Sequence, residues 1–139
     1  MIAAQLQEVL PAGPSLDEFE QGAFDPEQFS HGAHVYVAWC YLGRYELAES
    51  LQRFGAALRR FTASIGQSGK YHQTITWFFI LLVAERRIGP AASDWHRFVR
   101  DNPDLLQGAG PLLRRYYSEA RLDSERARQL FLLPDFPQG

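Results

Sequence analysis

The fold is decided by one stretch of the chain, residues 45–65, which reads YELAESLQRFGAALRRFTASI. Apolar residues recur there every three or four positions and therefore share one face of an α-helix. Charged and small residues occupy the other face. The stretch predicts an amphipathic helix packed against a core, with these apolar positions: Leu47, Leu51, Phe54, Leu58, Phe61 and Ile65.

The sequence on both sides of this stretch is also helical in character. Ser30 suits the N-cap of a helix over residues 31–42, which Gly43 would end. Residues 71–88 predict the central helix, because the side chains of residues 75–83 are apolar on almost every face. Shorter helices are expected over residues 94–101, 112–117 and 124–131, with Pro111 just before the second of them.

A chain of 139 residues has the size of one domain with its own hydrophobic core. Strict alternation of apolar and polar residues is missing, so strands are not expected. We therefore predict an all-α fold over residues 1–139, a single compact bundle of about five to six helices. It comprises an irregular but ordered lead-in (1–30, with short helices near 3–10 and 15–21), a helical body (31–133) and a tail (134–139).

Charge and apolar runs exclude several classes of protein. The net charge is −2; residues 1–30 carry six acids and no base, which leaves 14 bases and 10 acids for the rest. That balance is too mild for a nucleic-acid-binding face, and the pairs Arg59-Arg60, Arg86-Arg87 and Arg114-Arg115 are expected to be solvated cations near helix ends. The longest apolar run has eight residues, too few for a membrane span. With one cysteine and no signal-peptide pattern, a cytoplasmic location is expected.

The histidines are the most informative residues for function. His31 and His34 lie three positions apart and share one face in the first turn of their helix. His72 stands at the start of the central helix, next to Tyr71 and on the same face as Thr76. If the helix over residues 45–65 crosses back between the other two, both helix starts lie at one end of the bundle. The three rings would then converge on one pocket.

Three interpretations of this cluster remain open. The three histidines could bind a divalent metal ion such as zinc, iron or nickel and leave one coordination position for water. Alternatively, one histidine acts as general acid or base without a metal, while Tyr71 and Thr76 orient the substrate. In the third interpretation the histidines have structural roles near helix caps and loops. A carboxylate-rich di-iron bundle is disfavoured, because Glu and Asp are missing beside the histidines.

Three blocks of sequence resemble a family of small, uncharacterised bacterial all-helical proteins. FSHGAHV (29–35) with AWCYL (38–42) is similar to its F-[ST]-H-x-x-H-[LV]…A-W-x-Y-L pattern, and GKYHQTIT (69–76) to G-x-Y-H-x-T-[IL]-T. The block over residues 116–135 is similar to Y-Y-S…L-x-S-x-x-A-R…P-D, with Asp123 as a departure. The resemblance implies that His31, His34 and His72 belong to the family signature, and that Tyr116, Tyr117 and Ser118 lie near them. It implies no particular activity.

The sequence thus predicts a small-molecule enzyme with a histidine-centred pocket, either metal-assisted or working by metal-free general acid/base chemistry. Its candidate catalytic residues are His31, His34, His72, Tyr71 and Thr76, and the three histidines are the candidate metal ligands. The alternative is a non-catalytic helical module that binds a ligand or another protein. In the second case the partner can be a second copy of the chain, which gives a homodimer. The expected partner is a small organic molecule. Binding to nucleic acid or to a membrane is not expected.

Overall fold

The structure, a computed structural model, describes residues 12–136. Helices and connecting turns form all of this part, in which no strand occurs. The predicted all-α, compact fold is confirmed. The predicted helix over residues 3–10 lies outside the described residues.

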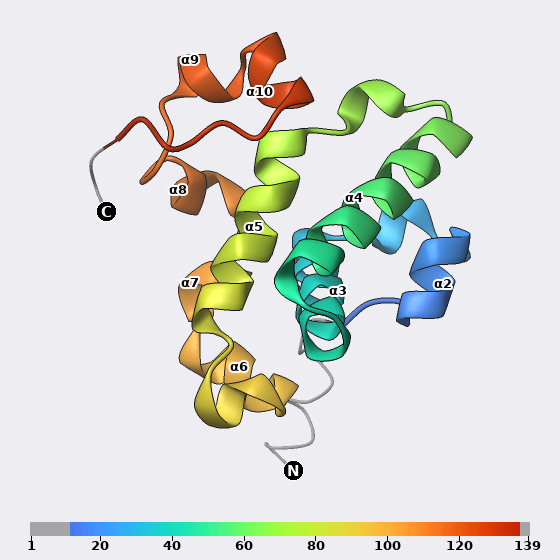
Figure 1. The fold of residues 1–139 in the computed structure, drawn as a ribbon, viewed down its shortest axis with the longest axis vertical. Coiled ribbons are helices and arrows are strands. Elements are labelled where there is room, and N and C mark those ends of the chain that lie inside the picture. The colour runs from blue at the N-terminus through green and yellow to red at the C-terminus, as the bar shows by residue number, and fades with distance from the viewer. Residues whose placement is uncertain (1–11, 137–139) are drawn as a thin grey trace.

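Three long helices form the centre of the fold: α3 (His31–Arg44), α4 (Leu47–Ser64) and α5 (Gln73–Arg86). The central helix α5 packs against both α3 and α4, and its opposite side carries the C-terminal helices (Figure 1). This agrees with the predicted central position of the most apolar helix. The remaining helices and 3-10 turns are α2 (Leu16–Gln21), η1 (Pro26–Gln28), η2 (Ser68–Lys70), η3 (Gly89–Ala92), α6 (Trp95–Asp101), α7 (Pro103–Leu106), α8 (Ala109–Leu113), α9 (Glu119–Leu122) and α10 (Glu125–Gln129).

Several helices begin at residues whose side chains cap them. The hydroxyl of Ser30 accepts a hydrogen bond from the backbone N–H of Ala33, as expected for the start of α3. The imidazole of His72 performs the same role for α5, since its Nδ1 accepts from the N–H of Ile75 at 3.1 Å. Ser118 and Ser124 cap α9 and α10 through their hydroxyls.

The structure differs from the sequence prediction at several helix ends. Helix α3 continues through Gly43 to Arg44. A Cβ on Gly43 would lie 2.7 Å from Nη2 of Arg87, so this glycine makes room for a packed guanidinium and does not end the helix. The predicted helix over residues 94–101 is followed by the additional short helix α7, which Pro103 starts, because a proline lacks only an N–H that a first turn leaves unpaired.

The C-terminal third is divided more finely than predicted. Helix α8 begins at Ala109, two residues before Pro111, and the expected helix over 124–131 is preceded by the separate helix α9. Residues 12–136 therefore contain nine α-helices instead of about five to six. Each C-terminal helix is too short to be stable alone and depends on contacts with α5 and the tail.

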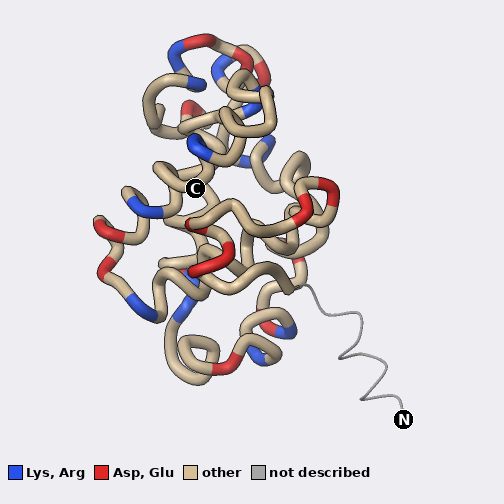
Figure 2. The backbone as a smooth tube through the Cα atoms, turned by 90° about the vertical axis from the view of Figure 1, so that its right-hand side faces the viewer, with Lys and Arg blue, Asp and Glu red and all other residues tan. Residues whose placement is uncertain are grey.

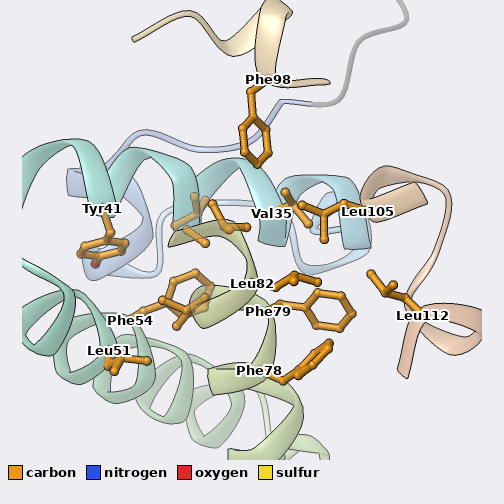
Figure 3. Close-up of a cluster of buried hydrophobic side chains, with 14 of the residues drawn as sticks. Val35, Tyr41, Leu51, Phe54, Phe78, Phe79, Leu82, Phe98, Leu105 and Leu112 are labelled. Atoms are coloured by element: carbon orange, nitrogen blue, oxygen red, sulfur yellow. The ribbon is translucent and has the colours of Figure 1, made fainter. Parts of the chain in front are cut away.

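The core is rich in aromatic side chains and joins all three long helices. Phe54 of α4, Phe79 of α5 and Val35 of α3 are almost completely shielded from solvent (Figure 3). Phe19 extends this core to α2, with its ring centroid 4.9 Å from that of Phe54. The high aromatic content of the chain is thus explained mainly by packing.

The surface carries charges of both signs. Figure 2 shows basic and acidic positions in most parts of the fold. Among residues 12–136, no helix is both long and apolar enough to cross a lipid bilayer.

Candidate functional site: an arginine-lined groove

His31 and His34 lie together, as their spacing predicted. Both rings contact Phe79 of α5, with centroid distances of 4.8 Å for His31 and 6.0 Å for His34. Nε2 of His31 is 2.8 Å from the carbonyl oxygen of Leu105 and donates to it. Burial lowers the pKa of His31, and the bond to Leu105 offsets part of that effect. His31 therefore fastens α3 to α7 as a neutral ring.

His34 is the most deeply buried of the four histidines. Its ring lies 4.8 Å from that of Phe54, and its Nε2 has no hydrogen-bond partner among the described residues. Burial, and secondarily the nearby His31, lowers the pKa of His34 to about 3. His34 is therefore neutral near pH 7, mainly because burial disfavours the charged imidazolium.

His72 lies at the N-terminus of α5 and uses both of its ring nitrogens within the fold. Besides the capping bond from Ile75, its Nε2 is 2.8 Å from the carbonyl oxygen of Leu122 and donates to it. This pairing requires the neutral ring with the proton on Nε2. Burial lowers the pKa of His72, which favours that form.

The predicted convergence of the three histidine rings is not found. His31 and His34 contact the middle of α5 at Phe79, whereas His72 caps its start and reaches toward α9. Within residues 12–136, no three His, Cys, Asp or Glu side chains are grouped so as to hold a metal ion. A metal would also have to displace a hydrogen bond from either nitrogen of His72. These residues do not fit the metal site that the sequence suggested.

Tyr71 and Thr76, the other two candidates, have different surroundings. Thr76 is 3% exposed and belongs to the buried face of α5. Tyr71 is half-buried, and its hydroxyl donates to Oε1 of Gln73 at 2.5 Å. Burial raises the pKa of the Tyr71 phenol, and the Arg59 guanidinium counters part of the increase. A role of the five candidates in catalysis stays a prediction.

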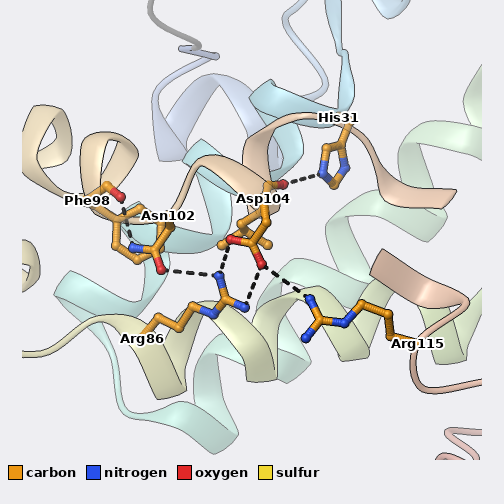
Figure 4. Close-up of polar contacts among 7 residues, drawn as sticks. His31, Arg86, Phe98, Asn102, Asp104 and Arg115 are labelled. Carbon is orange, nitrogen blue, oxygen red and sulfur yellow. Dashed lines mark hydrogen bonds and ion pairs between the residues drawn. The ribbon is translucent and has the colours of Figure 1, made fainter. Parts of the chain in front are cut away.

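A polar network lies next to Leu105, whose carbonyl oxygen accepts the hydrogen bond from His31. Arg86 of α5 forms two hydrogen bonds with Asp104, at 2.7 and 3.0 Å, and a third with Oδ1 of Asn102 at 3.2 Å (Figure 4). Arg115 reaches the same carboxylate at 3.8 Å. The Arg86 guanidinium holds the pKa of Asp104 below its usual range. These contacts fix α7 on α5, so this cluster has a structural role.

A large hollow lies elsewhere, between the second half of α4, the η2 turn and α10. It has a volume of about 550 Å³. Two arginines contribute to its wall, Arg59 from α4 and Arg128 from α10, and Tyr71 lies on the segment between η2 and α5. The complete wall consists of Arg59, Thr62, Ser68, Gly69, Tyr71, Glu125, Arg128 and Gln129. We call it the arginine groove.

Both arginines of the groove are held in place by neutral groups. The guanidinium of Arg59 lies 4.8 Å from the centroid of the Tyr71 ring and donates to Oε1 of Gln73 at 3.3 Å. Nη1 of Arg128 donates to the carbonyl oxygen of Gly69 at 2.6 Å. Neither forms an ion pair with a carboxylate of the described residues, in contrast to Arg53 and Arg86.

A smaller hollow of about 210 Å³ adjoins the arginine groove and shares Arg59 and Tyr71 with it. It lies between α4 and the start of α5. Its other lining residues are Leu51, Gln52, Gly55, Ala56, Gln73 and Trp77. We call it the side hollow.

Sequence reasoning missed the two arginines of the groove. Arg59 was interpreted as one of a pair of solvated cations near a helix end. Arg128 entered only as part of the block over residues 116–135 that resembles the family pattern. Nothing in the sequence places positions 59 and 128 near each other. One signal was available: Gly69-Lys70-Tyr71 and Ala127-Arg128 both belong to the proposed family signature. The structure joins these two blocks, since Arg128 donates a hydrogen bond to Gly69.

Comparison with known proteins yields no relative for this chain. No protein-family description, curated protein or solved structure matches it. Function must therefore be argued from the arrangement of its own residues.

Proposed function

We propose that this chain is a non-catalytic ligand-binding helical module, and that its ligand is a small organic anion held in the arginine groove. The observation that carries the proposal is that Arg59 and Arg128 line the same hollow without a carboxylate partner among residues 12–136. A guanidinium offers five N–H donors and matches carboxylate and phosphate oxygens in pairs. An anion between the two arginines would receive such bonds from both sides.

The fixed positions of the two guanidinium groups support this proposal. Arg59 is held by the Tyr71 ring and by Gln73, and Arg128 is held by the Gly69 carbonyl. Because these contacts restrict the side chains before a ligand arrives, less conformational entropy is lost on binding. The size of the groove, about 550 Å³, also lies within the range of small-molecule sites.

The contacts of the histidines support an enzyme less well than the arginine groove supports a binding module. His34 is enclosed by aromatic rings, and both nitrogens of His72 are bonded within the chain. Neither borders the groove or the side hollow. A binding module accounts for these contacts without assigning proton transfer to buried neutral rings. A cytoplasmic location, expected from the sequence, belongs to the same proposal.

Titration calorimetry with inorganic phosphate at low ionic strength tests the proposal. We expect phosphate to bind, and Arg59→Gln and Arg128→Gln to weaken binding by about tenfold each, as expected for a lost charge-assisted hydrogen bond. Arg60→Gln is the matched control, because Arg60 is exposed on the same helix and does not line the groove. Absence of phosphate binding, or equal binding by the Arg59→Gln and Arg60→Gln proteins, would overturn the proposal.

A further inference from the structure

We infer that the ligand of the arginine groove carries one aromatic ring beside its anionic group, and that this ring occupies the side hollow. The inference rests on the proposed anion binding in the groove. The two hollows share Arg59 and Tyr71, so an anion bound to Arg59 lies at the entrance of the side hollow. A group attached directly to the anion would enter there.

The lining of the side hollow suits an apolar, flat group. Leu51, Gly55 and Ala56 contribute apolar surface from α4, and Trp77 contributes an indole from α5. Burying the faces of a ring against such surface is favourable, since aromatic groups bring a large apolar area and prefer other rings as neighbours.

Gly55 lines the side hollow and determines how closely its two aromatic residues approach α4. It lies inside α4 with ordinary helical backbone, where glycine is less favourable than alanine by about 1 kcal/mol. A Cβ at this position would lie 3.1 Å from the Tyr71 hydroxyl oxygen and 3.6 Å from Nε1 of Trp77. The missing side chain therefore lets both aromatic residues approach the helix backbone.

The volume of the side hollow is sufficient for one ring. It measures about 210 Å³. A dry cavity of about 150 Å³ is enough for benzene, whereas a fused ring system with substituents needs more room. We therefore assign to the site an aryl anion with a single ring, either an aromatic carboxylate or an aryl phosphate.

Calorimetry with pairs of anions tests the ring independently of the charge. Phenyl phosphate is compared with methyl phosphate, and benzoate with acetate, so that each pair keeps its anionic group and differs in the ring. We expect the aromatic member of at least one pair to bind about tenfold more tightly, as burial of a ring requires. The pair with the larger difference identifies phosphate or carboxylate as the anionic group.

Filling the side hollow should remove this difference. Ala56 is exposed on α4 and lines the side hollow but not the groove, so Ala56→Leu should abolish the advantage of phenyl phosphate and leave methyl phosphate affinity unchanged. Ala63→Leu, exposed on the same helix and outside both hollows, is the control.

Three outcomes would contradict the inference in different ways. If both members of each pair bind with equal affinity and binding still depends on Arg59, the inferred aromatic ring is wrong, whereas anion binding in the groove stands. A ring advantage that survives Ala56→Leu places the ring outside the side hollow and also overturns the inference. If none of the four anions binds, both the inferred aromatic ring and the proposed anion-binding function are wrong.

Discussion

Arg128 and Gly69 are joined by a hydrogen bond of 2.6 Å from Nη1 to the carbonyl oxygen, between positions far apart in the sequence. This bond connects α10 to the η2 turn that precedes α5. It fixes one wall of the arginine groove relative to the other. The start of α5 adds two further connections to the C-terminal segment, through His72 and Thr74. The shape of the groove thus depends on how the C-terminal helices are attached to α5.

Acid should destabilise the protein through His34. Its pKa is about 3 in the folded protein against 6.5 for the free side chain, so the unfolded state binds more protons between these values. The stabilising effect of the neutral ring is complete above about pH 6.5 and is lost as pH falls toward 3, by about 1.4 kcal/mol per pH unit. Urea unfolding of the wild type and of His34→Leu between about pH 6.5 and 4.5 measures this slope.

The His34→Leu protein should show a slope that is smaller by about one proton. His96→Gln is the control, because the side chain of His96 is 55% exposed. Asp104 and Asp135, whose pKa values lie below 3.8, lose their contribution only at lower pH, outside this window. Identical slopes for the wild type and His34→Leu would show that His34 does not cause the acid sensitivity.

His72 should contribute to stability through two separable hydrogen bonds. His72→Ala removes the cap of α5 and the bond to Leu122, and should lower the free energy of unfolding by about 1–3 kcal/mol. His72→Asn keeps an acceptor at the N-cap and should recover about 1 kcal/mol of that loss. Urea unfolding checks both variants. If the Ala and Asn proteins are equally stable, the ring does not act as a cap.

Thr74 should hold the C-terminal segment on α5. Its buried Oγ1 lies 2.7 Å from the Ala127 carbonyl oxygen and 2.6 Å from that of Leu130, and accepts from the N–H of Leu132 at 3.1 Å. Thr74→Val keeps the shape and removes the hydroxyl, so unfolding should become easier by about 1–3 kcal/mol. Hydrogen exchange should accelerate at the Leu132 amide.

Thr62→Val is the control for this substitution, because within residues 12–136 the Thr62 hydroxyl bonds only to a carbonyl of its own helix, that of Arg59. It should change the free energy of unfolding by less than about 0.5 kcal/mol. A Leu132 amide that exchanges equally fast in the Thr74→Val protein and the wild type would contradict the role assigned to Thr74.

Glu125 should oppose anion binding, because it is the carboxylate in the wall of the arginine groove. It accepts a hydrogen bond from Nε2 of Gln129 at 3.0 Å and pairs with neither arginine. Glu125→Gln removes a repulsive charge and should tighten phosphate binding about two- to fivefold at low salt. Glu119→Gln, exposed on α9 and outside the groove, is the matched control for calorimetry. Weaker binding by the Glu125→Gln protein would be incompatible with an anionic ligand.

The long helices could be predicted because their signals are local. The apolar spacing in residues 45–65 identified α4, and Ser30 identified the start of α3. The short helices α7 and α9 were missed. Their stability comes from long-range contacts such as the bonds from His31 to Leu105 and from His72 to Leu122, which no local pattern encodes.

The candidate site was harder to predict for the same reason. The i, i+3 spacing correctly placed His31 beside His34, since helix geometry alone determines that pair. The position of His72 depended on where α5 begins relative to α3, and its ring became a cap. Arg59 and Arg128 resemble any solvated cation in the sequence, and only the folded chain brings them to one groove.

The most direct measurement of anion binding in the groove is a two-dimensional NMR titration of the isotopically labelled protein with inorganic phosphate. We predict saturable shifts of the backbone amides of residues 68–71 and 125–129, together with the Nε–H signal of Arg59. Shifts centred on His31 and His34 instead, or no saturable shift in any of these signals, would contradict the account.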